Sequence, residues 1–314
     1  FILGSFFSVL FLLGIAFIYG TTGETLLSSI ANKLKLENFN KSYILYFGIF
    51  LIIVSFLFKA GMAPFQQWIP DVYEGAPTPI TAFMSVGPKI AAVGALGRIL
   101  IEAFNLLNQV WIVQLIIVGI LTSIVGNIMA LRQTNTKRLL AYSSIAHAGY
   151  LLLAVISCSV IGLKAILFYS MVYMFMNIGA FAVLISYPEA EEIDKFTGLS
   201  QANLFLSLAM ISYLFSLTGL PPFGGFFAKF YVFKSIIETG YSWLAIIVIL
   251  FSVLSIYYYL RIGVKMFFIE SPVKEIHLSL SLKLIIFITL LGTLSLGLMP
   301  DVANFNDLLL FLRD

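Results

Sequence analysis

Charged residues are scarce in this sequence, and none of its long apolar runs holds a central Asp or Glu. Only 11% of the 314 residues are charged, 61% are hydrophobic, and the mean hydropathy is +1.03. A soluble domain holds roughly twice that share of charge. Apolar stretches of about 18 or more residues recur, each able to cross a hydrocarbon core of ~30 Å. We therefore predict an all-α polytopic bundle of transmembrane helices rather than a β-barrel, whose strands would appear as short alternating segments.

Cysteine and histidine are almost missing as well. The single cysteine, Cys158, excludes a disulfide within the chain and a cysteine-ligated metal or iron–sulfur site. Two histidines, one of them in a polar segment, argue against a buried bis-histidine haem. There is no Walker motif, no GxGxxG motif opening a helix after a strand, and no soluble domain for a nucleotide. We expect no cofactor, no nucleic-acid partner, and neither electron transfer nor ATP hydrolysis in this chain by itself.

The hydropathy pattern predicts about nine spans. The chain opens with Phe1 instead of Met and enters a span at once, without the basic segment or cleavage site of a signal peptide. We therefore expect it to be one piece of a longer protein with earlier spans. Basic residues outside the spans divide almost evenly between the two sides, so they do not determine the orientation. The predicted spans are 1–20, 42–68, 76–103, 110–130, 138–157, 162–187, 203–238, 242–268 and 281–299.

Two of these spans are interrupted by glycine and proline. The seventh would be about 54 Å long as one helix, too long for one crossing and too short for two. Its Gly-x-x-Pro-Phe pattern at 219–223, with Pro221 and Pro222, predicts two half-helices. The same pattern at 61–65, with Pro64, interrupts the second span. Matching interruptions indicate the repeated halves of a transporter; two independent proline kinks are the alternative.

Three lysines lie inside apolar runs: Lys59, Lys89 and Lys229. A charge at bilayer depth costs several kcal/mol, so it needs a task or a partner. Lys89 lies ~20 Å from either end of its span, too deep for snorkelling, and Pro88 frees a carbonyl near it. The other two lysines adjoin the interruptions, whose half-helix ends can organise water and ions. We interpret the three as lysines that exchange protons; structural lysines paired with carbonyls, or with acids of another segment, are the alternative.

His147 lies in the middle of the fifth span. Histidine titrates near neutral pH and suits a relay between two lysines, although a hydrogen-bonded packing role fits its position equally well. Lys137 and Arg138, at the start of that span, are interpreted as interfacial anchors. The acidic cluster at 189–194 is interpreted as a solvated loop.

Three stretches resemble a known family. They are WIPDVYEGAPTPITAF at 68–83, followed by SVGPK at 85–89; NTKRLLAYSSIAHAGY at 135–150; and LTGLPPFGGFFAK at 217–229. They are similar to the subunit N family of bacterial respiratory complex I, the NADH:quinone oxidoreductase. The first stretch distinguishes this family from its antiporter-like relatives, and the resemblance extends from end to end.

The resemblance implies an antiporter-like fold of fourteen spans with two inverted five-helix repeats, each with one broken helix. This chain would be a single transmembrane domain holding the last nine spans. It also implies that the loop 21–41 and the C-terminus lie outside. The implied parts are 42–103 as the end of the first repeat, 110–268 as the second repeat and 281–299 as the last span.

The resemblance also implies a function. Lys59, Lys89 and Lys229 fall on the family's proton-channel lysines, and protons would pass along them and His147. The family's glutamate of the fifth helix and lysine of the sixth would precede Phe1. NADH, FMN, iron–sulfur clusters and quinone would be held by partner subunits, and this chain would lie in the bacterial inner (plasma) membrane beside antiporter-like neighbours and small subunits.

Two other functions remain open. The first is a subunit of a multi-subunit cation/proton antiporter, which shares the helix architecture but has no redox partner. The second is a non-transporting membrane scaffold, against which the retained lysines argue because a buried charge is costly. A quinone site within this chain has no support, since no convergent polar pair for the head group is visible.

Overall fold

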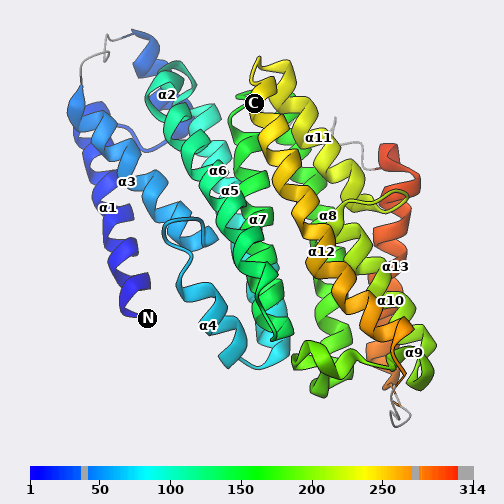
Figure 1. Ribbon diagram of the computed structural model, residues 1–314. Helices are drawn as coiled ribbons and strands as arrows, with labels where there is room; N and C mark the ends of the chain where they lie inside the picture. Colours follow the sequence, from blue (N-terminus) through cyan, green and yellow to red (C-terminus); the bar gives the residue numbers. More distant parts are fainter. Residues whose placement is uncertain (37–41, 271–275, 277, 303–314) are drawn as a thin grey trace.

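The computed structural model describes residues 1–36, 42–270, 276 and 278–302. The regular secondary structure of these residues is helical, apart from one isolated bridge between Asn135 and Glu192. Helices α1 and α3 lie at one side of the bundle, α12 and α13 at the other, and α5, α6 and α7 between them (Figure 1). The α-helices are α1 (Ile2–Thr22), α2 (Leu27–Leu36), α3 (Tyr43–Ala60), α4 (Trp68–Gly75), α5 (Thr78–Glu102), α6 (Asn108–Leu131), α7 (Thr136–Val155), α8 (Val160–Ser186), α9 (Leu199–Ala202), α10 (Leu204–Thr218), α11 (Gly224–Glu238), α12 (Ser242–Phe268) and α13 (Leu280–Leu298). Short 3-10 turns are η1 (Asn105–Leu107), η2 (Pro188–Glu191), η3 (Ile193–Phe196) and η4 (Pro300–Val302).

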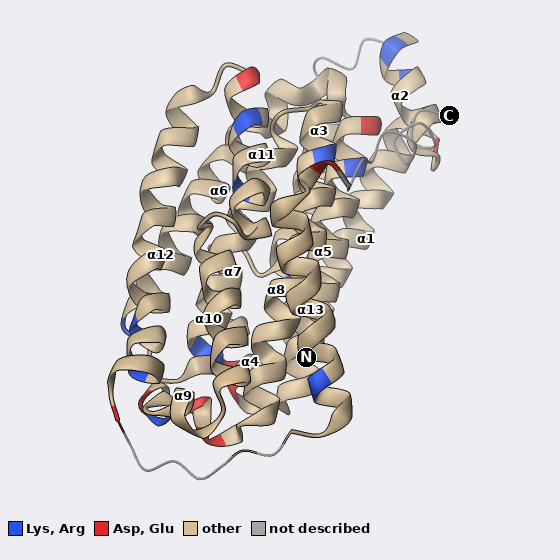
Figure 2. Cartoon of the chain, turned by 90° about the vertical axis from the view of Figure 1, so that its right-hand side faces the viewer, with Lys and Arg blue, Asp and Glu red and all other residues tan. Residues whose placement is uncertain are grey.

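The predicted polytopic helical bundle is confirmed. Eight helices among the described residues are long and apolar enough to cross a membrane, and α10 is a shorter apolar helix. Helices α10 and α11 together make the seventh predicted span, divided at the expected interruption into two half-helices. Charged residues gather near the two ends of the bundle, with little charge between them (Figure 2).

The structure differs from the prediction in two segments. The second span was expected to end at residue 68, but α3 stops at Ala60 and the chain resumes as the short helix α4, which extends to Gly75. Hydropathy missed α4 because its sequence is amphipathic, with acidic Asp71 and Glu74 among apolar residues. The expected loop 21–41 contains α2, while residues 37–41 and the C-terminal segment 303–314 lie outside the described residues.

Helix α7 forms the centre of the bundle. Every one of its residues except Arg138 is buried. The closest approach is to α6, where a Cβ on Gly126 would lie 2.4 Å from the backbone nitrogen of Ala146. Only glycine allows the two helices to approach this closely. The contact therefore fixes the distance between α6 and the middle of α7, next to His147.

Candidate functional site

The two helix interruptions share their local geometry. Gly61 and Gly219 each end a helix in the left-handed conformation, with φ values of 68° and 90°. In each case the next residue donates its N–H to the carbonyl five positions back, Met62 to Leu57 at 2.9 Å and Leu220 to Phe215 at 3.0 Å. This is the Schellman pattern of hydrogen bonds, and it leaves other carbonyls of the last turn without helical partners.

Lys229 reaches back from α11 to the second interruption. Its ammonium donates a 2.6 Å hydrogen bond to the carbonyl of Thr218, the last residue of α10, and lies 5.5 Å from the centre of the Tyr150 ring. The side chain is buried, and no described residue forms an ion pair with it. Lys229 thus donates a hydrogen bond to one of the carbonyls at the interruption.

Lys89 approaches α7 from α5. Its ammonium donates hydrogen bonds to the carbonyl of Ser144 at 2.9 Å and to the Ser144 hydroxyl at 2.6 Å. These partners belong to α7, so Lys89 does not depend on the carbonyl that Pro88 frees in its own helix. Lys89 is only 2% exposed and has no carboxylate partner in the part of the chain that the structure describes.

His147 lies between these two lysines. Its Nδ1 is 2.6 Å from the hydroxyl of Tyr169, and its ring interacts with the charges of both Lys89 and Lys229. Ser144, His147 and Tyr150 follow one another at intervals of three residues, which puts them on one face of α7 over ~9 Å of its axis. The structure therefore brings together a row of polar side chains, which we call the α7 line: Lys89, Ser144, His147, Tyr150 and Lys229.

Further buried hydroxyl and amide groups adjoin the α7 line. The Asn127 amide nitrogen donates to the Tyr150 hydroxyl at 2.8 Å, and the Tyr258 hydroxyl donates to the Asn127 amide oxygen at 3.1 Å. Ser143 and Tyr259 share a short hydrogen bond on the next face of α7. These partners fix the side chains of the line and extend it toward α6 and α12.

Lys59 stands apart from the line. It occupies the last turn of α3, its side chain is exposed, and its ammonium lies 5.1 Å from the centre of the Phe11 ring and 5.8 Å from that of Phe56. The structure thus brings together three of the four predicted site residues. A role for Lys59 in proton transfer stays a prediction.

Arg138 and Lys137 do more than anchor the start of α7. Arg138 contacts the carboxylates of Asp71 and Glu74 on α4, each at 2.8 Å. Lys137 is buried and pairs with Glu191 at 2.6 Å. The acidic residues of the DVYEG stretch therefore fasten α4 to α7, a role that the sequence did not reveal.

The acidic side chains of segment 189–194 are largely solvent-exposed, as expected, but the segment is also docked on the bundle. The Thr136 hydroxyl donates to the Ala190 carbonyl at 2.7 Å, and Lys265 on α12 pairs with Asp194 at 2.6 Å. The hydrogen bond and charge of Lys265 lower the pKa of the Asp194 carboxyl. Because this carboxyl stays ionised above that lowered pKa, the contact to α12 persists at neutral pH and is lost only in acid.

We expect Arg138→Gln to destabilise the protein by about 1 kcal/mol, since two carboxylates lose their cation at a partly exposed site. The unfolding midpoint of detergent-solubilised full-length protein measures this. Arg98→Gln is the matched control, because Arg98 makes one exposed ion pair with Glu102 within a single helix. An equal change in both variants would contradict a fastening role for Arg138.

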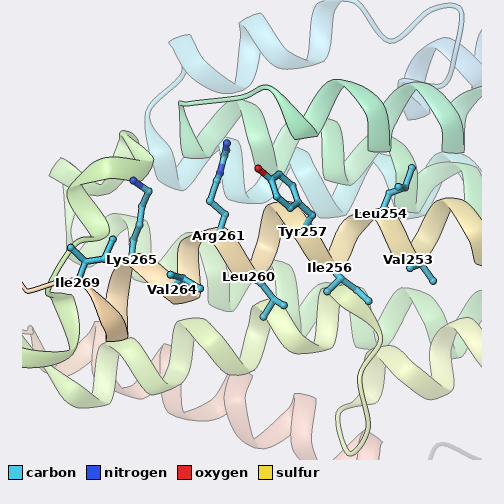
Figure 3. Close-up of a pocket in the computed structure, with 9 residues that line it drawn as sticks. All are labelled: Val253, Leu254, Ile256, Tyr257, Leu260, Arg261, Val264, Lys265 and Ile269. Carbon is cyan, nitrogen blue, oxygen red and sulfur yellow. The ribbon is translucent and has the colours of Figure 1, made fainter.

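The grooves along α12, beside the start of α1 and between α5 and α8 contain no residue of the α7 line. Figure 3 shows the groove along α12, whose lining is apolar apart from Tyr257, Arg261 and Lys265. Arg261 donates a hydrogen bond to the Gln133 carbonyl, and Lys265 donates one to the Asp194 carboxylate. No group of three His, Cys, Asp or Glu side chains suited to a metal occurs among the described residues. The candidate site is accordingly a buried row of proton donors and acceptors.

Sequence reasoning missed the hydroxyl partners of this row. The serine, histidine and tyrosine of α7 were visible at intervals of three within residues 135–150, a spacing that could have identified Ser144 and Tyr150. Tyr169 and Tyr173 on α8 gave no such signal, because only packing brings them to His147.

Comparison with known proteins agrees with the geometry. The family described as NADH:quinone oxidoreductase/Mrp antiporter, TM, matches residues 1–255. The chain is 45% identical to "NADH-quinone oxidoreductase subunit N 1" of Thermodesulfovibrio yellowstonii over 96% of its own length and 65% of that protein's. It therefore spans slightly less than two thirds of this curated relative.

Solved structures give the same fold. A chain of respiratory complex I from Thermus thermophilus with bound aureothin superposes with a TM-score of 0.81 at 31% identity, covering 96% of this chain and 66% of that one. A chain of the Mrp complex from Dietzia sp. DQ12-45-1b superposes with a TM-score of 0.85 at 20% identity, covering 99% and 68%, and so shows the fold alone. With most of its length matched by the family and its helices arranged in the same way, the chain belongs to the NADH:quinone oxidoreductase/Mrp antiporter transmembrane family.

Proposed function

We propose that this chain is part of a proton-translocating membrane-arm subunit of NADH:quinone oxidoreductase, the counterpart of subunit N. The observation that supports this most directly is the α7 line, in which two buried lysines flank a buried histidine and lack carboxylate partners among the described residues. The relative at 45% identity, named as subunit N 1 of that enzyme, favours the same function.

The groups of the line suit proton transfer. A lysine ammonium donates a proton, and a neutral imidazole accepts one on one nitrogen while it can release another from the second. Positive charges in a poorly solvated interior repel one another, and the His147 ring interacts with the charges of both Lys89 and Lys229. Protons would therefore move along the line one after another when the charge at either end changes.

The energy source lies outside this chain. Partner subunits would hold NADH, FMN, iron–sulfur clusters and quinone, while this chain, in the bacterial inner membrane, would contact antiporter-like neighbours, small subunits and lipid. A change in the partners can alter proton affinity here only by favouring one of two states of the helices. The helix interruptions are suited to such a change, because Lys229 donates a hydrogen bond to the last residue of α10 and Lys59 lies in the last turn of α3.

The repeat organisation remains part of the proposal. We infer that residues 42–103 end the first repeat, that 110–268 form the second, and that 281–299 are the last span. The matching Schellman geometry at Gly61 and Gly219 supports this division.

A cation/proton antiporter subunit is the second candidate, favoured by the fold shared with the Mrp complex. Membrane vesicles from cells lacking the gene, compared with cells given back the full-length gene, separate the two. We expect the deletion to remove NADH-driven proton uptake, followed by quenching of a pH-sensitive dye. If it removes only the proton movement driven by a sodium or potassium gradient without NADH, the antiporter function is correct.

A further inference from the structure

The side chains of the α7 line are not all joined by hydrogen bonds, and one of the gaps lies between Ser144 and His147. Lys89 is bonded to Ser144, and the Ser144 hydroxyl donates to the Ala141 carbonyl at 2.9 Å. His147 is bonded through Nδ1 to Tyr169. No direct hydrogen bond joins Ser144 to His147 within the described residues, so a proton leaving Lys89 needs a further group to reach the imidazole.

Tyr173 of α8 stands beside this gap. Its ring centre is 5.2 Å from that of His147, its side chain is fully buried, and its hydroxyl interacts with Ser144. That hydroxyl nevertheless makes no hydrogen bond of normal geometry to any described residue. Leaving a buried hydroxyl unbonded costs about 1–3 kcal/mol, and native proteins usually avoid the cost with an ordered water.

Neighbouring tyrosines differ from Tyr173 in this respect. Tyr169 is bonded to His147, Tyr150 to Asn127, and Tyr259 to Ser143. Among the buried unbonded polar atoms of the described residues, the Tyr173 oxygen is the one tyrosine hydroxyl. The unbonded hydroxyl therefore occurs where the α7 line is interrupted.

We propose that Tyr173 binds a water molecule in this gap and that the two pass protons between Lys89 and His147. An N–H bond of the Lys89 ammonium breaks and its proton goes to the water; a water proton goes to the Tyr173 oxygen, and the tyrosine proton goes to Nε2 of His147. The step takes the tautomer in which Nδ1–H donates to the Tyr169 hydroxyl and Nε2 is free to accept. Lysine ends as the neutral amine and histidine as the cation, while water and tyrosine are unchanged. This inference rests on the proposed function and adds one catalytic residue to it.

Tyr173→Phe in the full-length protein within its complex tests the proposal, because it removes the hydroxyl and keeps the ring against His147. We expect NADH-driven proton uptake per assembled complex to fall about tenfold or more, with a larger solvent deuterium isotope effect. Tyr213→Phe is the control: its hydroxyl is also buried but bonds to the Ile286 carbonyl and to Thr289, away from the line. The control should pump at the parental rate.

A second variant keeps the proposal testable if Tyr173→Phe fails to assemble. Incorporation of 3-fluorotyrosine at position 173 preserves the shape but makes the phenol more acidic, so a relay hydroxyl would shift the pH profile of pumping. Parental pumping and isotope effect in Tyr173→Phe, or an unshifted profile with fluorotyrosine, would overturn the proposal. If Lys89→Ala still stops pumping in that case, only the role of Tyr173 fails and the proposed function stands.

Discussion

Lys89→Ala in the full-length protein is expected to reduce NADH-driven proton uptake at least tenfold while the complex still assembles. Lys89 is the lysine at one end of the α7 line, bonded to Ser144 and to no carboxylate among the described residues. Alanine cannot exchange a proton, and a lost general acid or base costs about 10²- to 10⁴-fold in rate. The fold should tolerate the change, because loss of the hydrogen bonds and packing is offset by removal of a buried charge.

Dye quenching and quinone reduction, recorded on the same vesicles, measure this effect. Tight coupling predicts that both rates fall together. Lys234→Ala is the matched control, since Lys234 is exposed on α11 and pairs only loosely with Glu238 at 3.9 Å. Parental rates in Lys89→Ala would mean that Lys89 is structural and that protons do not follow the α7 line.

Gly225→Ala is expected to prevent accumulation of the folded protein. A Cβ at Gly225 would lie 1.7 Å from the carbonyl oxygen of Ser216, and the Gly225 N–H is bonded to the Ser216 hydroxyl at 3.1 Å. Since the obstructing atom is backbone, relief requires α11 to move away from α10. We expect a cost of at least ~3 kcal/mol, the upper range for overpacking.

The amount of full-length protein in membranes and its unfolding midpoint in detergent measure the effect of Gly225→Ala. Gly94→Ala in α5 is the control, because no atom lies within 4 Å of the added Cβ. There we expect no loss, or a gain of about 0.5–1 kcal/mol from improved helix propensity. Normal accumulation of Gly225→Ala would contradict the rigid contact inferred between the half-helices.

The sequence predicted the structure best at positions where the chemistry of a single residue restricts the local conformation or the burial. Gly219 and the prolines after it forced an interruption, and the depth of Lys89 required a buried site, so both were predictable from local chemistry. Helix α4 was not, because its apolar face only becomes evident once it packs on α7. Lys59 lies apart from the line and Tyr173 lies beside it. Both placements depend on contacts between distant helices, which a single sequence does not record.

The hydrogen bond from Lys229 to the Thr218 carbonyl has a consequence for how this charge is balanced. Thr218 ends α10, so the ammonium meets the negative pole of that helix, a partial charge of about half an electron spread over its last carbonyls. Within the described chain, the negative charge that balances Lys229 thus comes from main-chain carbonyls. No side-chain substitution deletes it, and its strength varies with the spacing and angle of the two half-helices. A small displacement of α10 against α11 would therefore alter how strongly the charge of Lys229 is balanced.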